Sequence, residues 1–350
     1  MKLKTLALSL SLLGCHLQAQ ATPAYYRFPS LRGDNLVFTA EGDLWKVARQ
    51  GGQAQRLTTH PALETQPSIS FDGKWLAFSA NYEGGVEAYV MPMQGGLPKR
   101  ISFDNTAVNV LGWTAQGEVL ISSQHQAGPN GQRVVSSINP QTLKRTVFPL
   151  ADANEATLDE SGRYVYFTRF GLQLTNDNVR NYRGGAHAQL WRFDLQSKQE
   201  ATRLFANETA NLRKPMWWQG KLYFLSDQDG SFNLWRAEAD GSQPQQLTQH
   251  KAWEVRNPSL ADGKIAYQSG ADVRVFDLAS NQDTAISIDL ISDFDQQRKR
   301  QIRNPLETLT DVDLAGREAR LLFTARGRLA IAGLGNQRLV ELAVPENARA

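Results

Sequence analysis

The 350-residue sequence predicts an all-β fold: a six-bladed β-propeller of four-stranded blades, followed by one extra blade-like unit. The first observation is a short apolar core strand that recurs seven times, at intervals of 40 to 57 residues. The second is that further strands follow it in the same order, and the third is that no long helical periodicity interrupts them. A period of roughly 40 to 50 residues is typical of a four-stranded propeller blade.

Each repeat contains a core strand, which a polar turn with Asp or Ser before Gly often precedes. The core strands are Leu36-Val37-Phe38, Leu76-Ala77-Phe78, Val119-Leu120-Ile121, Val165-Tyr166-Phe167, Leu222-Tyr223-Phe224, Ile265-Ala266-Tyr267 and Leu321-Leu322-Phe323. A third strand follows at 43–47, 88–91, 189–193, 233–236 and 273–276, and a fourth at 55–58, 99–102, 202–205 and 245–248. Trp45, Trp191 and Trp235 occupy equivalent positions, which predicts packing between blades.

Two long intervals have different origins. An insertion, Leu172 to His187, lengthens the fourth repeat between two strands. A charged stretch separates the sixth repeat from the seventh, so we expect a propeller at 22–290, a linker at 291–305 and a further blade at 306–350. A lone blade needs neighbours to bury its faces. We therefore interpret residues 306–350 as the first blade of a truncated second propeller; the alternative is a single seven-bladed ring.

The N-terminus has the features of an export signal. Lys2 and Lys4 precede an apolar run, and small residues follow it, so we expect a signal peptide at 1–21, cleavage after Ala21 and a periplasmic or secreted protein. Lipid attachment at Cys15, the one cysteine, is the alternative. No segment is apolar for long enough to predict an integral membrane span. Cleavage leaves a net charge of +1, which gives no electrostatic basis for binding nucleic acid.

Several stretches resemble a known family. Residues 65–79 and 258–267 are similar to the propeller repeat shared by TolB and the tricorn protease. Three further stretches resemble the tricorn protease in particular: residues 28–45, 182–191 and 304–327. The resemblance implies the N-terminal propeller of a secreted tricorn-like serine peptidase, whose PDZ and peptidase domains this chain lacks. It implies a role in channelling or gating peptides or unfolded segments, and in scaffolding an assembly, with homo-oligomers formed through the missing domains.

The residues predict no catalytic, metal or cofactor site. No Gly-x-Ser-x-Gly elbow, His-Glu-x-x-His helix or phosphate-binding loop occurs, and the family's catalytic serine, histidine and acid have no matching positions. His60 and Glu64 are four apart, but Pro61 opposes a helix, so we expect surface loop residues. We therefore expect a chain that is inactive alone. The alternative function is a TolB-like periplasmic protein-binding propeller. A third class, a propeller hydrolase or lyase, would need clustered acids or histidines at the channel mouth, which the sequence does not display.

The inserted loop carries the candidate binding residues. Arg180 and Arg183 flank Asn181-Tyr182 and precede Gly184-Gly185. Guanidinium groups bind carboxylates in a bidentate manner, so these two arginines could bind a peptide carboxylate at a propeller mouth. The alternative is an interdomain salt-bridge loop that packs on the part of the protein absent from this chain.

Overall fold

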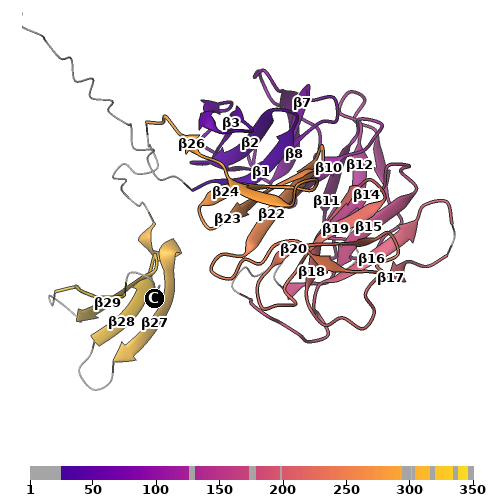
Figure 1. Cartoon of the computed structure of the whole chain (residues 1–350). Helices are drawn as coiled ribbons and strands as arrows, with labels where there is room; N and C mark the ends of the chain where they lie inside the picture. Colours follow the sequence, from indigo (N-terminus) through magenta and orange to yellow (C-terminus); the bar gives the residue numbers. More distant parts are fainter. Residues whose placement is uncertain are drawn as a thin grey trace, which may run out of the picture. The chain divides into compact units, whose positions relative to one another are not determined.

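The computed structural model describes residues 25–125, 131–172, 179–197, 199–293, 301, 304–315, 320–333 and 338–345. The chain divides between residues 293 and 294 into two compact units. Among the described residues, the first unit contains six four-stranded antiparallel sheets and the second contains one. The six sheets form the blades of a propeller (Figure 1). The predicted all-β fold class is confirmed, whereas the predicted signal peptide lies outside the described residues.

Each blade consists of four strands that follow one another in the chain and pair in that order. In blades 1 to 3 the strands are β1 (Arg27–Arg32), β2 (Asn35–Ala40), β3 (Asp43–Ala48) and β5 (Gln55–Arg56); β6 (Glu64–Ile69), β7 (Trp75–Ala80), β8 (Glu87–Pro92) and β9 (Lys99–Arg100); and β10 (Asn109–Trp113), β11 (Val119–Ser123), β12 (Val134–Ile138) and β13 (Arg145–Val147). In blades 4 to 6 they are β14 (Glu155–Leu158), β15 (Tyr164–Arg169), β16 (Gln189–Asp194) and β17 (Thr202–Arg203); β18 (Leu212–Trp218), β19 (Lys221–Ser226), β20 (Asn233–Glu238) and β21 (Gln245–Gln246); and β22 (Val255–Ala261), β23 (Lys264–Ser269), β24 (Asp272–Asp277) and β25 (Gln282–Ala285).

The second strand of each blade has a buried apolar centre because neighbouring blades cover both of its faces. Successive side chains of a strand point to opposite faces. In β2, Leu36 and Phe38 therefore pack in the seam with blade 6, while Val37 packs in the seam with blade 2. Six such hydrophobic clusters fill the six seams between neighbouring blades, so the ring is closed by packing. Trp45 is buried in one of them, as predicted.

A short clasp joins the end of the ring to its beginning. After blade 6, β26 (Ile288–Asp289) pairs in parallel with β4 (Gly52–Gln53) of blade 1. The Tyr26 hydroxyl donates a hydrogen bond to the backbone oxygen of Ile288 at 3.2 Å. The backbone N–H of Tyr26 also donates to the Ala271 oxygen at 3.0 Å. The clasp, these contacts of Tyr26 and the apolar seam close the ring, and no blade takes a strand from another part of the chain.

The inserted loop connects β15 to β16, so it leaves the blade intact, as predicted; its residues 173–178 lie outside the described part. In the second unit, a short 3₁₀ helix, Pro305–Thr308, precedes one sheet. Its strands are β27 (Leu309–Ala315), β28 (Arg320–Ala325), β29 (Arg328–Gly333) and β30 (Val340–Leu342). The described residues include no helix with the length and apolar character needed to cross a membrane.

Candidate functional site

A cavity of about 700 Å³ lies on the propeller axis and is the candidate functional site. Residues of all six innermost strands, β1, β6, β10, β14, β18 and β22, line it. The innermost strands of a propeller all run in the same direction along the axis, so their first residues lie at one end of this channel. The turns that follow them lie at the other end. We call these the N-terminal and C-terminal ends of the channel.

Four of the innermost strands share a β-bulge that shapes the channel wall. In each, a residue with positive φ, between 47° and 52°, precedes a proline, and the pairing with the second strand shifts register there. Proline cannot donate to the sheet ladder, so bulges are where it is tolerated. The four pairs, all of which line the channel, are Phe28-Pro29, Gln66-Pro67, Lys214-Pro215 and Asn257-Pro258. This feature was not predicted, although a proline recurs before the core strand of blades 1, 2, 5 and 6 and is a signal that the sequence contains.

The N-terminal end of the channel contains an ionic cluster between blades 4 and 5. The Arg213 Nη2 and Lys214 Nζ atoms lie 2.9 and 3.2 Å from Oε1 of the buried Glu155. The backbone N–H of Lys214, which lies in the bulge, donates a hydrogen bond to Glu155 Oε2 at 2.8 Å. Burial alone would raise the pKa of Glu155, but the two cations and their hydrogen bonds lower it to about 2. Two cations thus surround one carboxylate at this end.

The C-terminal end of the channel is lined by aromatic side chains. Phe71, Trp113, Trp217 and Trp218 line it from blades 2, 3 and 5. The Trp113 indole N–H donates to the backbone oxygen of Ser68 at 2.9 Å. The Trp217 ring stacks on Tyr166 with centroids 5.0 Å apart, and its indole N–H donates to the carboxylate of Glu160. These contacts fix the orientation of the Trp113 and Trp217 rings at this end of the channel.

The two arginines predicted to bind a peptide carboxylate each contact an acidic side chain of the same chain. Arg183 Nη1 donates to Asp227 Oδ1 at 2.9 Å, and its Nη2 donates to the Asp227 backbone oxygen at 2.9 Å. Arg180 Nη2 lies 3.4 Å from Glu254 Oε1. The inserted loop thereby connects blade 4 to blades 5 and 6, and neither arginine lines the channel. Peptide binding by Arg180 and Arg183 remains a prediction, and a ligand would compete with these carboxylates.

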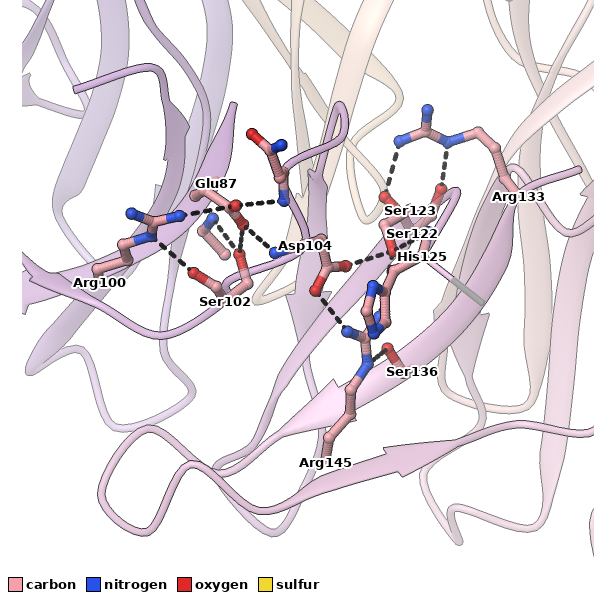
Figure 2. A network of polar contacts seen from close by, with 12 residues as sticks. Glu87, Arg100, Ser102, Asp104, Ser122, Ser123, His125, Arg133, Ser136 and Arg145 are labelled. Atoms are coloured by element: carbon pink, nitrogen blue, oxygen red, sulfur yellow. Dashed lines mark hydrogen bonds and ion pairs between the residues drawn. The ribbon is translucent and has the colours of Figure 1, made fainter. Parts of the chain in front are cut away.

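Blades 2 and 3 share a polar network whose residues could be mistaken for a catalytic group (Figure 2). The Ser123 hydroxyl donates to Asp104 Oδ2 at 2.6 Å, and Arg145 Nη1 donates to Asp104 Oδ1 at 2.7 Å. His125 enters through its backbone N–H, which donates to the Ser123 oxygen at 3.3 Å. A nucleophilic serine is activated by a base such as imidazole. Here the hydroxyl instead joins a carboxylate that Arg145 neutralises, so the network cross-links the blades.

The prediction that His60 and Glu64 are both surface loop residues is wrong for Glu64, which lies in the seam between blades 1 and 2. His60 is exposed as expected, but Glu64 is fully buried at the start of β6. Its carboxylate accepts hydrogen bonds from the backbone N–H of Leu44 at 3.0 Å and from the hydroxyls of Thr58 and Tyr82. Burial raises its pKa to about 7 because these donors offset the desolvation only in part, and the nearby Asp43 opposes a second negative charge. The prediction failed because the chain enters an inner strand directly after Pro61.

Comparisons with known proteins agree with this architecture. The family described as the tricorn protease N-terminal β-propeller domain matches residues 23–282. Tricorn protease homolog 1 of Streptomyces coelicolor is 28% identical over 258 residues, which are 73% of this chain and 24% of that protein. The tricorn protease homolog of Saccharolobus solfataricus is 24% identical over 312 residues, 87% of this chain and 28% of that protein. The chain thus spans about a quarter of the length of these relatives.

Solved structures show the same fold. The crystal structure of the tricorn protease superposes with a TM-score of 0.71 at 18% identity, covering 94% of this chain and 32% of that one. The β-propeller domain of the Trilobed protease from Pyrococcus furiosus, described as having an open velcro topology, gives a TM-score of 0.52 at 13% identity, covering 75% of this chain and 98% of that one. The resemblance inferred from the sequence is confirmed, and the chain belongs to the family of tricorn protease N-terminal β-propeller domains.

Proposed function

We propose that the axial channel of this propeller admits extended peptides or unfolded segments, as the peptide-channelling part of a tricorn-type serine peptidase. The cavity on the propeller axis is the observation that carries this proposal. Its volume of about 700 Å³ falls within the roughly 300–1,000 Å³ typical of ligand sites, and its wall combines apolar with a few polar side chains. The four bulges support it, since the extra residue of a bulge is left outside the sheet ladder.

Catalysis belongs, on this proposal, to the peptidase domains of the complete enzyme. The serine, carboxylate and arginine groups of blades 2 and 3 are engaged with one another, as the Ser123–Asp104 and Arg145–Asp104 hydrogen bonds illustrate. The propeller would bind peptides without cleaving them, and would scaffold the assembly of the larger enzyme.

A blocked channel tests the proposal. Ser259 lines the channel, whereas Ser280 is exposed on the outer turn of the same blade. We expect the full chain to bind fluorescein-labelled peptides rich in Ala, Ser and Gly, and Ser259→Trp to weaken that binding at least about tenfold because the indole fills the cavity. Ser280→Trp is the control and should bind as the native chain does. Equal binding by all three proteins would contradict the proposal, and peptide cleavage would contradict the non-catalytic role.

We also propose export from the cytoplasm, with the leader removed after Ala21. The charged start, apolar run and small residues of positions 1–21 support it. N-terminal sequencing of the protein recovered from the periplasm of an expressing bacterium should give Thr22 as the first residue. A lipid-modified Cys15 at the N-terminus would support the lipoprotein alternative instead.

A further inference from the structure

One quadrant of the channel rim combines aromatic rings with a carboxylate. At the C-terminal end, Glu160 of blade 4 lies between Trp113 of blade 3 and Trp217 of blade 5, and all three side chains line the cavity. The hydrogen bond from the Trp217 indole fixes the Glu160 carboxylate against the ring. Asp159, the neighbouring residue, also lines the cavity. Aromatic faces and carboxylates both attract cations, so the quadrant has the chemistry of a cation site.

Neither Asp159 nor Glu160 forms an ion pair with another described residue. The basic residue of the same turn, Arg163, is instead directed to Asp194, whose two oxygens accept hydrogen bonds from it at 2.9 and 2.6 Å. Asp159 also accepts hydrogen bonds from the Ser161 hydroxyl and the Tyr164 backbone N–H, and its charge acts on Arg163. A cation entering the quadrant would therefore meet chiefly the charge of Glu160.

The opposite side of the same rim already holds a cation in this manner. The Arg32 guanidinium lies over the Phe71 ring, 4.9 Å from its centroid, and its Nη1 atom is 3.1 Å from Asp262 Oδ1. Both Arg32 and Phe71 line the cavity. The chain thus places one aromatic, one carboxylate and one cation together at the rim, while the Trp217–Glu160 pair has the first two components.

We propose that this quadrant, formed by Trp113, Glu160 and Trp217, binds the cationic side chains of lysine or arginine residues in peptides at the channel rim. The inference rests on the proposed peptide-binding function of the channel and gives its preferred ligand class. The charge distribution along the axis supports it, because Arg213 and Lys214 place excess positive charge at the other end. A cationic residue is therefore attracted to the C-terminal end and repelled from the N-terminal end.

Matched peptides measure this preference on the full chain. The probes are acetylated and amidated peptides rich in Ala, Ser and Gly that differ at one central position, which is lysine, norleucine or glutamate. Blocked ends ensure that the central side chain alone differs in charge. We expect the lysine peptide to bind about fivefold more tightly than the norleucine peptide, and the glutamate peptide to bind most weakly. The lysine preference should fall as salt concentration rises.

Glu160→Gln localises the preference, because an amide oxygen can still accept the Trp217 hydrogen bond while the charge is lost. This variant should lose most of the lysine preference, because the aromatic rings and Asp159 retain only part of the attraction. Glu200→Gln removes an exposed carboxylate of the same blade outside the channel and should leave the preference unchanged. If the native chain binds all three peptides equally, or if Glu160→Gln keeps the preference, the cation site is refuted while the channel function stands. Absence of binding by every peptide would refute both.

Discussion

Two seams of the propeller each contain a buried glutamate at the start of an inner strand, but the pKa of the glutamate is raised in one seam and lowered in the other. Glu64 lies between blades 1 and 2 and has its pKa raised to about 7. Glu155 lies between blades 4 and 5 and has its pKa lowered to about 2. Burial penalises the ionised form in both seams. Burial alone therefore does not decide whether a carboxylate in this fold is charged.

The neighbours of each glutamate account for the difference. Glu155 faces Arg213 and Lys214, and their positive charges outweigh the cost of burial. Glu64 faces neutral hydroxyls, and the arginine of its seam, Arg56, is directed to Asp43 instead. One seam is therefore held by an ion pair that needs its charge, whereas in the other the cost of burying a charge exceeds the gain from three donors that favour the ionised carboxylate.

The largest expected effect is on the charged seam. Glu155→Gln leaves Arg213 and Lys214 partly buried without a counter-charge, so we expect unfolding free energy at pH 7 to fall by about 3 kcal/mol. Urea denaturation measures this loss. Native Glu155 contributes stability above its usual pKa of 4.5 and loses that contribution as pH falls towards 2, so the difference between the two proteins should shrink over that window.

Glu118→Gln is the control for this comparison. Glu118 is half-buried and accepts a hydrogen bond from the Ser137 hydroxyl at 2.5 Å. Its replacement should cost about 1 kcal/mol or less, since an amide oxygen accepts the same bond. A loss in Glu155→Gln that stays constant from pH 7 to pH 3 would show that packing, not charge, holds the seam.

The neutral seam should respond in the opposite direction. Because the folded pKa of Glu64, about 7, lies above its usual 4.5, this group's contribution to stability is complete below pH 4.5 and is lost as pH rises through 7. Glu64→Gln mimics the protonated acid, so at pH 8 we expect it to be more stable than the native chain, on the order of 2 kcal/mol. At pH 4.5 the two proteins should unfold at the same urea concentration. Destabilisation at pH 8 would contradict a neutral Glu64.

A third seam, between blades 6 and 1, adds a backbone clasp to its apolar cluster and to the Arg32–Asp262 ion pair. A Cβ on Gly51, whose φ is +93°, would lie 2.3 Å from the backbone oxygen of Ser287, beside the β4–β26 pair. Gly52, with φ +105°, has no atom near that position. Both alanine variants are strained by positive φ, but Gly51→Ala should lose about 1 kcal/mol more than Gly52→Ala because it also opens the clasp. Equal thermal stability of the two variants would show that the clasp contributes nothing.

The smallest effect is expected for an ion pair outside the seams. The side chains of Lys221 and Glu238, in blade 5, are 40% and 38% exposed, so water screens their attraction. Lys221→Met should change the unfolding free energy by about 0.5 kcal/mol or less. The loss in Glu155→Gln should exceed it several-fold in the same denaturation assay. Similar losses would remove the distinction between buried and exposed pairs.

The sequence predicts the blades well because the strands of each blade are close together in the chain. The core strands and the tryptophan at Trp45 repeat along the chain, and the period of the repeat determines the class of fold. The site depends instead on the seams, where distant residues meet: Glu155 binds Arg213, and Glu160 binds Trp217. No local pattern indicates which acid receives a cation. Nor does a local pattern show that Glu64 is buried, since its burial depends on packing between two blades.

The closure of the ring has a consequence for how such a protein can be rebuilt. Since no blade takes a strand from another part of the chain, the backbone passes from each blade to the next around the ring. After blade 6 it returns to blade 1, where β26 pairs with β4 and Tyr26 contacts Ile288. Duplicating or deleting one repeat in the gene would add or remove a whole blade, and no strand would be separated from its sheet. Joining residues near these two points and opening another outer loop would rotate the order of the blades along the chain while preserving every sheet.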